Sequence, residues 1–310
     1  MVDTQIDERL ERAAIALDGL SVGDAFGRSF FSIHPPTVPD VVRSRALPPS
    51  PWRYTDDTVM ALSVISILRQ DKQINQDWLA HSFAQRYDPG RGYGPSMNQA
   101  LRRVRAGEPW EAVMRSQFEG HGSFGNGAAM RVAPVGAYFA DDLDVVAEQA
   151  RLSAEVTHTH PEGVAGAVAI AIAVAWAWRL RDTGLVPTSQ KFIDHILTYV
   201  PDSEVASRIR QAHTLPPDTS IDVAVDLLGN GSHVSAQDTV PFALWCAANH
   251  LGSYEDALWV TASGLGDVDT TCAMVGGIVA LYTGPVGIPS SWITAREPLP
   301  SWPYVERNSA

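Results

Sequence analysis

Apolar residues recur along this chain with the spacing of α-helices, and strand-like alternation is nearly absent. Leu10, Ala13, Leu17 and Leu20 fall on one helical face near the N-terminus. The same spacing, together with prolines placed at first turns, predicts further helices at residues 59–68, 77–87, 95–106, 109–118, 142–156, 161–178, 189–199, 203–213, 221–228, 239–251, 254–263 and 270–282. The best strand candidate is the short, proline-flanked segment 38–42. The pattern therefore predicts an all-α fold.

The chain shows no internal repeat, low-complexity tract or shift in composition that would mark a domain boundary. Its 310 residues are compatible with one large domain. The proline-rich stretch 30–53 is interpreted as a loop that covers a site rather than a linker. The apolar run 163–178, bounded by Glu162 and Arg179, is short for a membrane span and is expected to be a buried core helix.

Composition narrows the classes of function. With 45% hydrophobic and 19% charged residues, the chain is not mainly disordered. Its net charge of −12 argues against a general binder of nucleic acids or anionic membranes. A small anionic ligand stays compatible, because bound divalent cations would reverse the charge locally. Cys246 and Cys272 without a CxxC motif, and a charged N-terminus without a signal peptide, predict a cytoplasmic protein with reduced cysteines.

Two acidic clusters, roughly two hundred residues apart, carry the main chemical signal. They comprise Thr55, Asp56 and Asp57 in the first, and Asp267, Asp269 and Thr270 in the second. Each cluster precedes a predicted helix, where N-capping accounts for one acidic residue but not for two. Four carboxylates brought together would repel each other unless cations neutralised them. All-oxygen ligand sets suit Mg²⁺, Mn²⁺ or Ca²⁺, so a metal site built from both ends of the chain is predicted.

A glycine-rich stretch at residues 121–131 precedes a predicted helix of small residues. Exposed backbone N–H groups at such a helix start bind phosphate or diphosphate groups. The alternative is a tight turn that lets helices pack closely, since neither GxGxxG nor a Walker A motif is present. Downstream, His158 and His160 lack further zinc-ligand partners, so one is expected to contact a ligand and the other to lie at the surface.

Glycines recur at every fourth position in the first predicted helix. Residues 19–23 match the GxSxG pattern of esterases, but a nucleophile elbow requires a strand before the serine, and this match lies within a helix. The spacing of Gly19, Gly23 and Gly27 instead predicts a smooth helix face against which another helix packs closely.

Taken in order, these motifs resemble the ADP-ribosylglycohydrolases. The resemblance rests on residues 19–27, 54–58, 91–94, 122–131 and 265–270. It is strongest with the branch that includes the serine-ADP-ribosyl and poly(ADP-ribose)-cleaving hydrolases, through residues 83–94 and 122–132. The resemblance implies a single all-helical domain over residues 1–310, with its core at about residues 7–284.

The resemblance also implies a set of site residues and a cofactor. The metal ligands would be Thr55, Asp56, Asp57, Asp267, Asp269 and Thr270, holding two Mg²⁺ or Mn²⁺ ions. The substrate-binding residues would be Gly122, Ser123, Phe124, Gly125 and Asn126, which hold the diphosphate and neighbouring ribose, together with His158. Among the ligands, Asp57, Asp56 and Asp269 are expected to be catalytic, with Asp57 positioning a water molecule.

The implied activity is hydrolysis of the bond between the anomeric carbon of ADP-ribose and an acceptor. The protein is expected to be a monomer that binds ADP-ribose and ADP-ribosylated proteins or small molecules. No membrane partner is expected, and nucleic acid is expected only as an ADP-ribosylated substrate. The sequence departs from this branch at one position. The branch carries a glutamate on a mobile flap, whereas the corresponding residues 28–34 here contain no acid, and Ser32 stands in place of the glutamate. Val268 also replaces a threonine of the family motif.

Two other functions fit the motifs. The absent flap glutamate favours a non-catalytic ADP-ribose-binding protein on the same scaffold, whereas the complete set of candidate metal ligands favours an enzyme. A glycosyltransferase with a DxD motif would need an α/β fold, which the helical pattern argues against.

Overall fold

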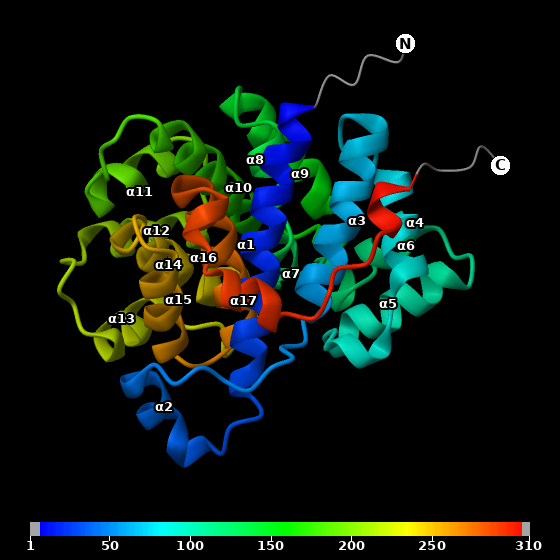
Figure 1. Cartoon of the computed structure of the whole chain (residues 1–310). Helices are drawn as coiled ribbons and strands as arrows, with labels where there is room; N and C mark the ends of the chain where they lie inside the picture. The colour runs from blue at the N-terminus through cyan, green and yellow to red at the C-terminus, as the bar shows by residue number, and fades with distance from the viewer. Residues whose placement is uncertain (1–6, 306–310) are drawn as a thin grey trace, which may run out of the picture.

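The computed structural model describes residues 7–305, and within that range it contains seventeen α-helices and no β-strand (Figure 1). The predicted all-α fold is confirmed. The α-helices are α1 (Glu8–Phe30), α2 (Val38–Ser44), α3 (Asp56–Asp71), α4 (Gln76–Arg86), α5 (Pro95–Arg105), α6 (Trp110–Arg115), α7 (Gly127–Met130), α8 (Ala133–Tyr138), α9 (Leu143–Glu155), α10 (Pro161–Arg181), α11 (Ser189–Leu197), α12 (Glu204–Thr214), α13 (Ile221–Leu228), α14 (Ala236–Asn249), α15 (Tyr254–Ser263), α16 (Val268–Thr283) and α17 (Ser290–Ala295). Short 3₁₀ turns lie at Pro35–Thr37, Pro89–Arg91, Phe118–Gly120, Pro285–Gly287 and Trp302–Tyr304.

The long apolar helix α10 forms the centre of the fold. It packs against α7, α8, α9, α14 and α16, and 72% of its most apolar window is buried by these neighbours. By length and composition alone α10 could cross a membrane, but such helices also occur in protein cores. The burial of α10 on nearly all sides confirms the prediction of a core helix.

The glycine face of α1 packs directly on α16, and the two helices run side by side in Figure 1. A Cβ atom at Gly23 would lie 2.1 Å from the backbone oxygen of Cys272, and one at Gly27 would lie 2.4 Å from that of Val268. Only glycine permits this approach. The prediction that the glycines at every fourth position form a face for close helix packing is therefore confirmed. The contact brings the second half of α1 to the N-terminus of α16, where the second acidic cluster begins.

Adding one methyl group to this contact should be strongly destabilising. We expect Gly23→Ala to lower the free energy of unfolding by about 3 kcal/mol, because backbone atoms cannot rotate away from the new Cβ. Gly94→Ala is the matched control, since a Cβ at Gly94 meets no atom within 4 Å. Urea unfolding measures both variants, and equal midpoints for the two would contradict close packing of α1 on α16.

The strand predicted at residues 38–42 is wrong, because this segment begins helix α2. Pro39 lies in the first helical turn, where its missing N–H leaves no hydrogen bond unmade. Val38 is buried, and Val41 and Val42 pack against the core, which is the three- and four-residue spacing of a helix. The β-branched side chains that suggested a strand therefore fill a helical face. Helix α6 is also shorter than the predicted segment 109–118.

Candidate active site

The fold brings the two acidic clusters to one cavity of about 470 Å³. Asp56 and Asp57 lie in the first turn of α3, and Asp269 lies in the first turn of α16. Asp267, which immediately precedes α16, and Thr270 line the same cavity. Thr55 is the buried N-cap of α3 and lines the neighbouring cavity instead. The carboxylates thus face one another from the starts of two helices.

A fifth aspartate, Asp24, holds the start of α3 in place. It is fully buried on α1 and accepts hydrogen bonds from the Thr55 N–H at 2.9 Å and from the Thr55 Oγ1 at 2.9 Å. It also accepts bonds from the Thr58 N–H at 3.2 Å and the Thr58 Oγ1 at 2.5 Å. The sequence places Asp24 inside an amphipathic helix, more than thirty residues before its partners. Its role as a positioning residue was not predicted.

Removal from water and the charges of neighbouring carboxylates raise the pKa values at this cavity. Burial raises the pKa of Asp56 to about 7, with the Asp24 carboxylate adding to the rise. Burial, followed by the charges of Asp24 and Asp56, raises the pKa of Asp57 well above its ordinary value. The pKa of Asp269 is raised strongly by burial and then by Asp267. The cluster therefore carries its full negative charge at neutral pH only at a large free-energy cost.

Asp267 is turned into the cavity by a strained turn and a second loop. Leu265 and Gly266 have φ values of 55° and 72°, in the left-handed region. The Asp267 N–H donates to the backbone oxygen of Asn230 at 3.0 Å, and the Asn126 amide donates to Asp267 Oδ2 at 2.7 Å. The glycine-rich loop and the acidic cluster are thus joined directly. The bracing loop at residues 229–235 carries no motif that would have revealed it.

The chemistry of these donors suits a hard cation. All the candidate ligand atoms are oxygens, and Asp57 Oδ2 is buried without a hydrogen-bond partner. Among residues 7–305, no group of three or more His, Cys, Asp or Glu side chains is arranged so that it could hold a metal ion without other ligands or a shift of side chains. Mg²⁺ commonly binds through one or two carboxylates and keeps several waters. The carboxylates around this cavity fit an ion bound in that way.

The glycine-rich loop forms the opposite wall of the cavity. Residues 123–127 line it, whereas Gly122, with a φ of 77°, does not. Ser123 Oγ accepts a bond from the Gly125 N–H at 3.2 Å. A Cβ at Gly127 would lie 2.9 Å from Cε1 of His158, so this glycine makes room for the imidazole. Close packing therefore explains several of the glycines. The ring of Phe124, 38% exposed, lies at the rim of the cavity.

A chain of hydrogen bonds connects Arg131 to the His158 ring. Arg131, fully buried, donates from Nη2 to Thr157 Oγ1 at 2.8 Å. Thr157 Oγ1 lies 2.7 Å from His158 Nδ1. Donation of the one hydroxyl proton to Nδ1 would put the ring proton on Nε2, and His158 lines the cavity. His160, by contrast, is partly exposed and caps α10, where its Nδ1 accepts from the Glu162 N–H.

This arrangement predicts that His158 stays neutral well into the acid range. Burial, and then the charge of Arg131, lower the pKa of His158 to about 3. A lowered pKa means that stability is lost as pH falls from about 6.5 toward 3. Nitrogen-15 NMR should show the Nε2–H tautomer from pH 8 to pH 5 in the wild type and in Thr157→Ser, but not in Thr157→Val. An imidazolium signal at pH 6 would contradict the assignment.

Comparisons with known proteins cover nearly the whole chain. A sequence model of the family described as ADP-ribosylglycohydrolase matches residues 5–307. The chain is 30% identical to the human ADP-ribosylhydrolase ARH3, over 91% of this chain and 88% of that protein. It is 25% identical to the ADP-ribosylarginine hydrolase Tri1 of Serratia proteamaculans, over 92% and 75%. A solved structure titled ADP-ribosylglycohydrolase-related protein complex aligns with a TM-score of 0.60 at 26% identity, covering 94% of each chain.

Proposed function

The chain belongs to the ADP-ribosylglycohydrolase family, and we propose that it hydrolyses the bond between ADP-ribose and an acceptor with the help of divalent cations. One observation supports the cation dependence above all. Four carboxylates, one buried and three half-buried, line a single cavity. Removal from water raises the pKa of each, and the charges of neighbouring carboxylates add to the rise at Asp56, Asp57 and Asp269. Cations would relieve this repulsion.

The ligands of the proposed cations come from both helix starts. Two Mg²⁺ or Mn²⁺ ions would be held by Thr55, Asp56, Asp57, Asp267, Asp269 and Thr270. When bound, such ions lower the pKa of water and neutralise nearby charge. Thr55 Oγ1 donates to Asp24 and accepts the Asp57 N–H at 3.4 Å, which leaves one acceptor position for an ion.

Asp57 is the proposed group that orients the attacking water. Its side chain lies at the cavity, where the carboxylate would accept a proton from water as the new carbon–oxygen bond forms. Departure of the acceptor gives the ribose oxocarbenium character, and the carboxylates around the cavity stabilise that positive charge. The products are free ADP-ribose and the unmodified acceptor.

The opposite wall would hold the ADP part of the substrate. Within the loop from Gly122 to Asn126, the N–H groups of Gly122 and Asn126 donate to the backbone oxygens of Gln117 and Val234, and that of Gly125 donates to Ser123 Oγ. The N–H groups of Ser123 and Phe124 would therefore bind the diphosphate, and the Nε2–H of His158 would add a neutral donor. Phe124 can stack on an aromatic base, because its exposed ring lies at the rim of the cavity. Asn126 connects this half to the carboxylates through its bond to Asp267.

Ser123→Ala tests the assignment of the two walls. We expect the affinity for ADP-ribose to fall about tenfold, because the loop loses the Ser123 side chain that holds Gly125. The affinity for Mg²⁺ should not change. Isothermal titration measures both, with Ser207→Ala on the exposed face of α12 as the control. Unchanged ADP-ribose affinity would contradict the diphosphate assignment, whereas Asn126→Ala should weaken both ligands.

A further inference from the structure

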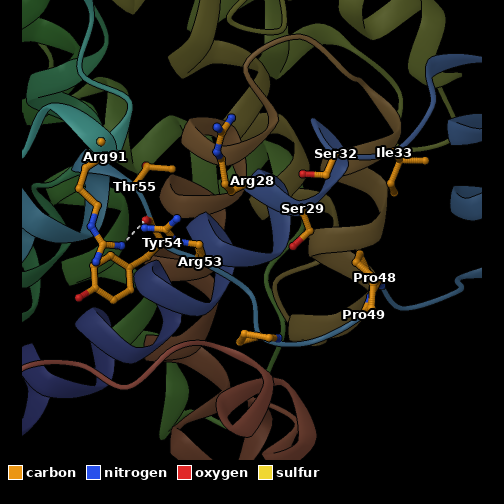
Figure 2. Close-up of a pocket in the computed structure, with 12 residues that line it drawn as sticks. Arg28, Ser29, Ser32, Ile33, Pro48, Pro49, Arg53, Tyr54, Thr55 and Arg91 are labelled. Carbon is orange, nitrogen blue, oxygen red and sulfur yellow. Dashed lines mark hydrogen bonds between the residues drawn. The ribbon is translucent and has the colours of Figure 1, made fainter.

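A second cavity, of about 380 Å³, adjoins the carboxylate cavity (Figure 2). It is formed by the C-terminal end of α1, the proline-rich segment at residues 48–53 and the turn at residues 90–91. At two places in the chain, neighbouring residues line different cavities. Thr55 faces this one and Asp56 the other, while Arg91 faces this one and Gly92 the other. The two cavities therefore share a wall at the start of α3.

This second cavity is positively charged in an otherwise acidic protein. Arg28, Arg53 and Arg91 line it, and none of its twelve lining residues is acidic. Arg91 is paired with Glu297, and its Nε lies 3.8 Å from Asp88 Oδ2. Neither Arg28 nor Arg53 has a carboxylate within 4.0 Å among residues 7–305. This is notable because acidic side chains outnumber basic ones in the whole chain, 35 to 23. Arg28 instead lies over the ring of Phe31, 5.3 Å from its centroid.

We propose that this cavity is the acceptor subsite and that it takes an acceptor with an anionic group, a phosphate or a carboxylate, at the bond that is cut. The inference rests on the proposed function. ADP-ribose would extend from the glycine-rich loop to the carboxylates, so its anomeric carbon lies at the shared wall and the acceptor projects beyond it. Guanidinium groups bind phosphate and carboxylate through paired hydrogen bonds.

The charge of this subsite also accounts for the absence of an acid in the flap stretch. A phosphate group that enters with one proton leaves the anomeric carbon as hydrogenphosphate, so the broken carbon–oxygen bond needs no further proton donor on the leaving oxygen. Water supplies the new hydroxyl of ADP-ribose, and its proton goes to the Asp57 carboxylate. Arg28 and Arg53 stabilise the negative charge on the departing group. A guanidinium acceptor, by contrast, would be repelled by both arginines.

The test compares acceptors on the Mg²⁺-loaded enzyme. ADP-ribose carrying a phosphate on its anomeric hydroxyl should give a kcat/KM at least about tenfold above that of arginine-linked ADP-ribose. In Arg28→Gln/Arg53→Gln this advantage should fall about 10- to 100-fold, because two charge-assisted contacts are lost, while inhibition by free ADP-ribose stays the same. Arg115→Gln, at an exposed arginine on α6 outside both cavities, is the control.

The outcomes separate the two proposals. Preference for the arginine-linked substrate, or a double variant that cleaves the phosphate-linked substrate like the wild type, would overturn the anionic subsite and leave the hydrolase intact. A carboxylate-linked substrate that is cleaved in preference to the phosphate-linked one, with the same loss in the double variant, would assign the anion as carboxylate. Absence of release from every acceptor would overturn the proposed function, and the subsite with it.

Discussion

Replacing Asp269 with asparagine is expected to slow ADP-ribose release about 10³-fold while making the metal-free protein more stable at pH 8. The loss of rate follows from the position of Asp269 at the start of α16, where its carboxylate lines the cavity beside Asp267. The gain in stability follows from its pKa, which burial and Asp267 raise well above the ordinary value. A carboxyl whose folded pKa is raised destabilises the fold as pH rises through that pKa.

Two measurements check this prediction. Turnover is followed with Mg²⁺, and thermal unfolding is followed in EDTA at pH 5 and pH 8. The wild type should be less stable at pH 8 than at pH 5. Asp56, whose pKa is raised to about 7, also lowers the stability of the fold as the pH rises. Asp222→Asn, in the exposed first turn of α13, is the matched control and should change neither quantity. Full activity of Asp269→Asn would contradict the carboxylate site.

Asp24→Ala is expected to lower the free energy of unfolding by about 3 kcal/mol and to abolish turnover. The substitution leaves the Thr58 hydroxyl and the N–H groups of Thr55 and Thr58 buried without their acceptor. It also releases the first turn of α3, which carries two of the proposed ligands. Both effects arise from one residue that does not itself line the carboxylate cavity.

Asp24→Asn serves as the comparison, because it keeps the size of the side chain and one carboxamide oxygen. It should lose less stability than Asp24→Ala in urea unfolding, and it should retain more activity. If the two variants unfolded at the same urea concentration as the wild type, the connection between α1 and the start of α3 would be without energetic importance. A stable but inactive Asp24→Ala would restrict the role of Asp24 to positioning.

The helices could be predicted because most of them bury one face and follow the three- and four-residue spacing of apolar positions. Segment 38–42 was misassigned because its valines have the side chains of a strand but the spacing of a helix. The close contact of α1 with α16 was visible as glycines at every fourth position. Local patterns of this kind are properties of consecutive residues, which a sequence displays directly.

The parts of the site that escaped prediction depend on contacts between distant residues. Asp24 acquires its role through Thr55 and Thr58, which only the packing of α3 against α1 brings near. Asn126 meets Asp267 across 141 positions of sequence. The positive cavity was hidden for the same reason, since Arg28, Arg53 and Arg91 are far apart in the sequence and come together only in the fold.

The most direct test of the account is the release of free ADP-ribose from a panel of phosphate-, arginine- and serine-linked substrates, measured with Mg²⁺, with Mn²⁺ and with EDTA. We expect release from at least one linkage; it should depend on the divalent ion and be absent in Asp269→Asn. Release that persists unchanged in EDTA would contradict the role of the carboxylates. Tight binding of ADP-ribose without release from any substrate would instead identify a binding protein.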